Sequence, residues 1–312
     1  MKKLCLLIAA LGFLSISFRS SAQIVSKDFD SPVVQAFMKG KIFAVLTNDD
    51  QFNKWYQSTV QKVWSCSEIQ FITAAELDSA VRSDKNFFLF PQAKDDKTAA
   101  VHLLNSDDIT KKKEFYVVLS QGGYKQTKLL FTSALTGTKI IGSFRYSPER
   151  SEITAGMTEC EMLIALLNQS IQVIMAYQIK NEVKDSVKIV ITDELASQIA
   201  EKTLIINQAY TDGSIALEDK PIITEKVLAD YPYESQVVAK DGLEDMISGD
   251  TEAYCYLFFY FPSQYIKPSD DSGDILVYDP AQKKFLYYDD NLDGPWFEKY
   301  KMKDMVYAIK SK

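Results

Sequence analysis

Asp289, Asn291 and Asp293 place side-chain oxygen atoms at alternate positions of a short acidic segment, and Gly294 follows them directly. This spacing is typical of the first half of a calcium loop, in which alternate residues coordinate the ion and a glycine permits the sharp turn. The second half departs from the pattern, because Tyr300 occupies the twelfth position, where a bidentate glutamate is expected. The sequence leaves two interpretations, a weak calcium site at these three residues or a polar loop without an ion, and the departure favours the loop.

A second group of polar side chains follows the first apolar segment of each half of the chain. Ligands of parallel sheets usually bind at the edge where the strands end, so these side chains are a prediction of a ligand site made from position alone. Aspartates just before a helix also cap it and complement its dipole, which is the structural alternative. The predicted site consists of Asn48, Asp49, Asp50, Tyr210 and Asp212.

The residue types and motifs that several classes of enzyme require are missing or scarce in this sequence. His102 is the single histidine, and it lies in a predicted strand between Val101 and Leu103. A zinc site with several histidines cannot be assembled within one chain, and a histidine-dependent triad would depend on this one residue, so both reaction classes are disfavoured. The glycine-rich signatures of dinucleotide and phosphate binding are absent, as is a CxxC pair. No residue is singled out as catalytic.

Three cysteines follow the N-terminal leader, an odd number for a disulfide framework. Cys66, Cys160 and Cys255 do not occupy equivalent places in the two halves, which favours buried apolar thiols over an inherited bridge. An exported protein can still form one disulfide, and the sequence does not choose the pair.

The elements that must position these residues are duplicated. Segments 41–91 and 202–262 each begin with lysine and a short apolar run and end in a second apolar run closed by Phe-Pro. Residues 68–72 align without gaps with residues 234–238. The pattern predicts one order of strand, helix and strand used twice.

Within the first copy, apolar residues at helical spacing predict a helix over 52–64, and residues 73–76 form a capping box for the next one. In the second copy we expect a helix that begins at Pro221 and a central strand over 253–261. Antiparallel strands should extend both sheets; those predicted span 99–104, 115–119, 128–133 and 139–144 in the first copy and 275–278 and 284–288 in the second. The fold class is α/β, with α+β as the alternative: a tandem duplication of a β-α-β-α-β unit with added antiparallel strands, joined by a long helix.

That long helix is predicted over 158–180, which contains neither proline nor glycine. The segment 162–179 carries no charge, yet Asn168, Gln169 and Gln172 would need hydrogen-bond partners within a bilayer. The amides therefore favour a helix buried between domains, or between the subunits of a homo-oligomer, over a membrane span.

The first residues predict export. Lys2 and Lys3 precede an apolar segment, and small residues then lead to Gln23, as at a signal-peptide cleavage site. Removal of the leader takes away three basic residues and no acidic ones, so the net charge moves from −7 to −10. The predicted domains are a signal peptide over 1–22, a first α/β unit over 23–155, a connecting helix over 156–185 and a second α/β unit over 186–312.

An acidic chain without a basic stripe is poorly suited to bind nucleic acid or an anionic membrane surface. We expect an exported protein, periplasmic or extracellular, that binds or scaffolds in the cell envelope without catalysis and contacts a protein partner there. The alternatives are a carboxylate-dependent hydrolase acting on an envelope or extracellular glycan and a weak calcium-dependent assembly module.

Overall fold

The computed structural model describes residues 25, 31–93, 115–130, 139–146, 157–179, 193–217, 220–249, 251–260, 274–289 and 297–310. Two five-stranded mixed sheets dominate these residues. The first has the order β2-β1-β3-β4-β5, formed by Ile69–Ile72, Lys41–Val45, Asn86–Ala93, Phe115–Gln121 and Ile140–Tyr146. The second has the order β9-β6-β10-β11-β12, formed by Ser235–Val238, Thr203–Asn207, Tyr254–Tyr260, Asp274–Asp279 and Lys284–Asp289.

The two sheets share one topology, which confirms the duplication. In each, the first three strands in chain order are parallel, and the last two add antiparallel as hairpins. The register agrees as well, because Ile42 pairs with Ile69 and Phe87 where Leu204 pairs with Ser235 and Cys255.

Even the irregularity of the last hairpin is repeated, with register shifts at Leu119/Ser120 and at Val277/Tyr278, which are equivalent positions. The register also corrects one detail of the sequence comparison. Lys41 corresponds to Thr203 and not to Lys202, since Ile42 and Leu204 both face the helical layer that carries the last helix of their unit.

The helices cover the sheets in the same pattern in both units. On the first sheet α2 (Ser31–Lys39), α3 (Asp50–Val63) and α7 (Met157–Ile179) cover one face, and α4 (Ala74–Ala80) covers the other. On the second sheet α8 (Asp193–Ser197), α9 (Glu225–Asp230) and α11 (Phe297–Lys310) cover the equivalent face, and α10 (Lys240–Ser248) the opposite one. Short 3-10 turns at Gln198–Glu201 and Gln208–Tyr210 and a small hairpin of β7 (Ala216–Leu217) and β8 (Lys220–Pro221) complete the second unit.

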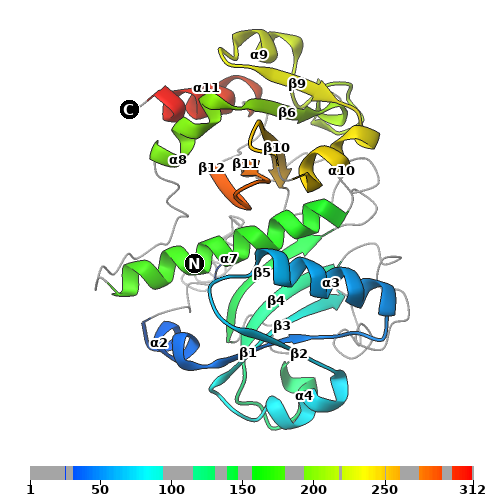
Figure 1. Cartoon of the computed structure of the whole chain (residues 1–312), viewed down its shortest axis with the longest axis vertical. Coiled ribbons are helices and arrows are strands. Elements are labelled where there is room, and N and C mark those ends of the chain that lie inside the picture. Colours follow the sequence, from blue (N-terminus) through cyan, green and yellow to red (C-terminus); the bar gives the residue numbers. More distant parts are fainter. Residues whose placement is uncertain are drawn as a thin grey trace, which may run out of the picture.

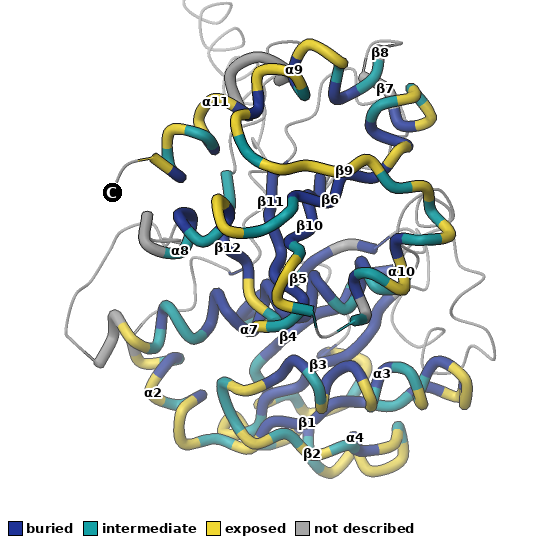
Figure 2. Tube along the Cα trace, turned by 45° about the horizontal axis from the view of Figure 1, so that its top comes forward, coloured by how far each residue is buried: buried dark blue, intermediate teal, exposed yellow. Residues whose placement is uncertain are grey.

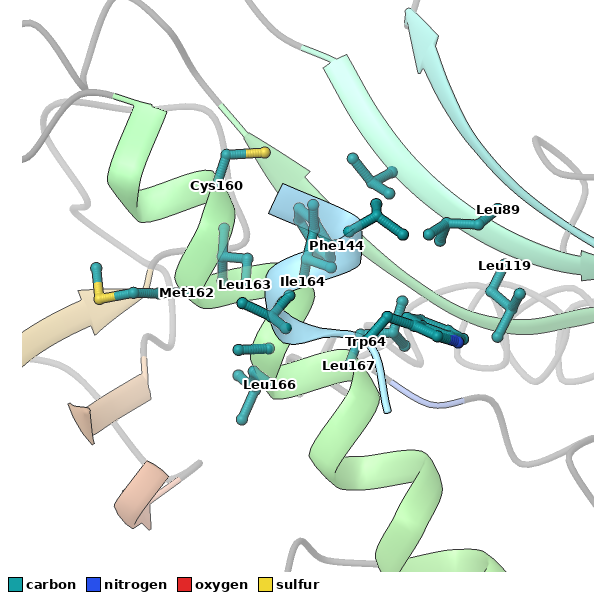
Figure 3. Packing of buried hydrophobic residues seen from close by; sticks show 14 of the residues in the cluster. Trp64, Leu89, Leu119, Phe144, Cys160, Met162, Leu163, Ile164, Leu166 and Leu167 are labelled. Carbon is teal, nitrogen blue, oxygen red and sulfur yellow. The ribbon is translucent and has the colours of Figure 1, made fainter. Parts of the chain in front are cut away.

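The units are stacked head to tail, so that α7 lies between the two sheets (Figure 1). One hydrophobic core joins α7 to the first sheet and to the α10 face of the second, while two smaller cores lie under α4 and under α11. Burial follows this stacking, with dark blue along the strands and α7 and exposed residues on α4, α9 and β9 (Figure 2). Figure 3 shows Ile164 and Leu167 of α7 beside Phe144 and Trp64 of the first unit, with Met162 pointing toward the second.

The predicted helix 158–180 is confirmed almost to the residue, and its amides find partners within the protein. Gln169 Oε1 accepts a hydrogen bond from the backbone N–H of Phe285 at 2.8 Å, and Gln169 Nε2 donates to the Phe285 carbonyl at 3.1 Å. Asn168 Oδ1 accepts from the N–H groups of Ser65 and Cys66. The helix is thus buried between two units of one chain, which leaves its central part no surface for a contact between subunits.

Among the described residues, no helix combines the length and apolar character that crossing a bilayer requires.

Two local expectations are wrong. Pro221 lies in β8, and α9 begins four residues later at Glu225, with the Thr224 hydroxyl accepting from the Val227 N–H. Residues 127–130 are helical, so the predicted strand 128–133 does not begin there. The central place of β10 and the capping box at Thr73 and Glu76 are confirmed.

Candidate functional site

The polar residues after β1 form a local network that ends the strand and starts α3. The Asp49 carboxylate accepts a hydrogen bond from the Phe52 N–H at 2.9 Å and therefore caps α3. Thr47 is tied to Asn53, whose side-chain amide donates to the Thr47 carbonyl at 2.7 Å. Asn48 and Asp50 are exposed. Asp49, which was predicted to belong to a ligand site, therefore has a structural role as the cap of α3.

The corresponding residues of the second unit are divided between core and surface. Tyr210 is fully buried, and its ring meets that of Phe259 edge to face at 4.7 Å between centroids. Asp212 is exposed and accepts a hydrogen bond from the Ser214 N–H at 2.8 Å, as in an Asx turn. The five residues of the predicted ligand site follow strands of two different sheets and do not form one described cluster.

Of the three predicted calcium ligands, only Asp289 lies within the described residues. It ends β12 half-buried, and its Oδ2 accepts a hydrogen bond from the Tyr287 hydroxyl at 3.4 Å. Asn291 and Asp293 fall outside the described residues, as does His102. The described ranges contain no group of three or more histidine, cysteine, aspartate or glutamate side chains placed to hold a metal ion. Calcium binding at these three residues stays a prediction.

Cys66, Cys160 and Cys255 are free thiols in the described part of the chain. Burial raises the pKa of Cys66 and of Cys255 to about 12, and it also raises the pKa of Cys160. A thiol with so high a pKa is almost wholly protonated near neutral pH, so none of the three has the character of an activated nucleophile.

A pocket of about 480 Å³ opens between α9 and α11. Figure 1 shows both helices on the side of the second sheet that points away from α7. Its volume lies in the lower part of the range that small-molecule sites occupy. Val227, Tyr231 and Met302 are buried in its wall. The lining residues are Thr224, Lys226, Val227, Asp230, Tyr231, Met302, Lys303 and Val306.

The duplication allows this place to be compared with its equivalent in the first unit, where the two helices pack directly on each other. There the equivalent helices are α3 and α7, and α3 has 14 residues where α9 has 6. The longer helix buries Phe52, Tyr56, Val60 and Val63 and is joined to α7 by an ion pair of 2.7 Å between Lys62 Nζ and Glu161 Oε1. The shorter α9 buries Val227 and forms no ion pair with α11 among the described residues.

The Thr224 hydroxyl caps α9, whereas the other polar side chains of the pocket have no comparable role among the described residues. Within the described residues, Lys226, Asp230 and Lys303 form no ion pair, and the buried hydroxyl of Tyr231 has no hydrogen-bond partner. Burial, with smaller contributions from Cys255 and Tyr233, raises the pKa of Tyr231 well above its ordinary value, so its hydroxyl stays neutral.

The sequence did not predict this site, because neither of the two helices that line it was predicted correctly. The helix that corresponds to α9 was predicted to begin at Pro221, which is too early. No helix was predicted over 297–310, although Met302, Met305 and Ile309 follow helical spacing there.

No protein-family model matches this chain, and neither a curated protein nor a solved structure matches it.

Proposed function

We propose that the chain is an exported binding protein of the cell envelope that works without catalysis and holds its ligand in the pocket between α9 and α11. The observation that carries this proposal is the difference between two equivalent places: an ion pair joins α3 to α7 in the first unit, and a pocket is lined by α9 and α11 in the second. Function resides in sites that are built on a fold, so two copies of one fold can differ in the site that they carry.

The neighbouring chemistry supports binding over turnover. The pocket contains one carboxylate, Asp230, whereas hydrolysis of a glycan requires two carboxyl groups flanking the scissile bond. The buried thiols are protonated, and Asp49 is engaged as a helix cap. The signal-like residues at the start of the chain support the export part of the proposal.

Native mass spectrometry of the protein purified from an envelope fraction tests the proposal. We expect a bound small molecule on the wild-type chain and its loss in Val306→Trp, since the larger side chain fills the pocket. Tyr307→Trp is the matched control, because Tyr307 is on the same helix and 75% exposed. A wild-type protein without any bound molecule, which instead releases products from envelope glycans, would contradict the proposal.

A further inference from the structure

The mouth of the pocket is positively charged on an acidic protein. Lys226 on α9 and Lys303 on α11 line it from opposite sides, and Asp230 is the single acidic lining residue. Both lysines are exposed, and neither forms an ion pair within the described residues. Counted over the lining residues alone, the two ammonium groups and the one carboxylate give a net charge of +1, whereas the chain as a whole carries −7.

The wall behind this mouth is apolar. Val227 and Met302 are buried, Val306 is half-buried, and the Tyr231 ring packs edge to face on Tyr233 at 5.6 Å between centroids. Apolar surface that faces a cavity is stabilised when a ligand displaces the water from it. The Tyr231 hydroxyl stays neutral, so it presents no negative charge to an approaching anion.

From these two properties we infer that the ligand is a small amphiphilic carboxylate, with its apolar body between α9 and α11 and its head group at Lys226 and Lys303. This inference rests on the proposed binding function and adds the class of ligand. Charge complementarity carries it: an anion gains attraction to both lysines, whereas a cation of the same shape meets repulsion from them.

Calorimetric titration of the full mature chain at low salt tests the inference, with dodecanoate as the probe below its critical micelle concentration. Dodecanol and dodecyltrimethylammonium are the neutral and cationic probes of the same chain length. We expect dodecanoate to bind most tightly and its affinity to fall as salt is added, because exposed charges are screened.

Variants assign the effect to the pocket. Lys226→Gln and Lys303→Gln should each weaken dodecanoate binding by about twofold to fivefold, as expected for exposed ion pairs, and together by about tenfold. Lys310→Gln, on α11 but outside the pocket lining, should leave the affinity unchanged. All of these substitutions replace exposed side chains and should preserve folding.

The outcomes separate the two proposals. If dodecanol or the cation binds as tightly as dodecanoate and Val306→Trp abolishes that binding, the ligand class is overturned and the binding function stands. Equal affinities of the wild-type chain and the double lysine variant for dodecanoate also overturn the ligand class. Binding of none of the three probes overturns it as well, and the mass-spectrometric experiment then decides the binding function alone.

Discussion

Asp279 is a buried carboxylate of the second unit whose two oxygen atoms both have partners. It ends β11 with no exposed side-chain surface, and its Oδ2 lies 3.2 Å from Lys202 Nζ. Its Oδ1 accepts hydrogen bonds from the N–H groups of Ala281 and Gln282 and so forms the turn into β12. A charge buried this deeply is tolerated because every side of it has a partner.

We predict that Asp279→Asn lowers the free energy of unfolding by about 3–5 kcal/mol, because the amide leaves Lys202, whose side chain is 10% exposed, without its counter-charge. Urea denaturation measures the change. Asp241→Asn, at an exposed position of α10, is the control and should cost less than about 0.5 kcal/mol. Adding Lys202→Met to Asp279→Asn should recover part of the loss, and a double variant less stable than the single one would refute the pairing.

The raised pKa values of two buried thiols predict that the stability of the protein depends on pH. Because burial raises the pKa of Cys66 and Cys255 from 9.0 to about 12, the folded chain holds these protons after the unfolded chain has released them. Their contribution to stability is complete below pH 9 and is lost as the pH rises from about 9 toward 12.

Labelling with iodoacetamide at pH 8 checks this expectation. The folded protein should react at least about a hundredfold more slowly than the urea-unfolded protein, since alkylation requires the thiolate. Rapid labelling of the folded chain at Cys255 would show that this thiol is activated and would reopen the enzyme interpretation.

At the scale of elements, the sequence predicted most of what was needed to recognise the fold. The apolar runs that begin at residues 42 and 253 predicted central strands, and residues 42–45 and 255–260 are indeed buried on both faces of their sheets. The uncharged segment 162–179 predicted a helix whose central residues, 162–171, are buried. The failures have local causes. Proline is compatible both with the start of a helix and with an edge strand. Pro221 pairs with Ala216 in the β7–β8 hairpin, and α9 begins only after its cap at Thr224.

The amides of α7 explain why this helix belongs inside a protein. We predict that Gln169→Leu costs about 2–4 kcal/mol, since it leaves the buried N–H and C=O groups of Phe285 without their partners. Gln172→Leu is the matched control on the same helix. The Gln172 amide donates to the hydroxyl of the exposed Ser65, so the loss of this hydrogen bond should cost less than about 1 kcal/mol. Equal costs in urea denaturation would contradict this account of the interface.

At the scale of the whole molecule, α7 and α11 are equivalent helices with different surroundings. Each follows the last strand of its unit, but α7 is covered by the second unit and carries no charge over 162–179, whereas α11 exposes Lys303, Asp304 and Tyr307. A polar outer helix ends a stack of repeats, as terminal caps do in repeat proteins. The candidate pocket lies beside this terminal helix and could not be predicted from sequence, because it depends on the length of α9 in three dimensions.

The shared core predicts cooperative unfolding. Because α7 contributes to one hydrophobic core with both sheets, removal of either unit exposes apolar surface of the other. We expect circular dichroism and tryptophan fluorescence to report one coincident urea transition, with Trp55 and Trp64 reporting the first unit. Two separated transitions would show that the units are independent domains.

Ligand binding in the second unit alone is tested by hydrogen exchange measured with and without dodecanoate, because the equivalent helices of the first unit, α3 and α7, serve as an internal control. If the pocket between α9 and α11 holds the ligand, exchange slows in α9 and α11 when the ligand is present and is unchanged in α3 and α7. Protection of α3 and α7, or no protection in α9 and α11 at saturating ligand, would contradict it.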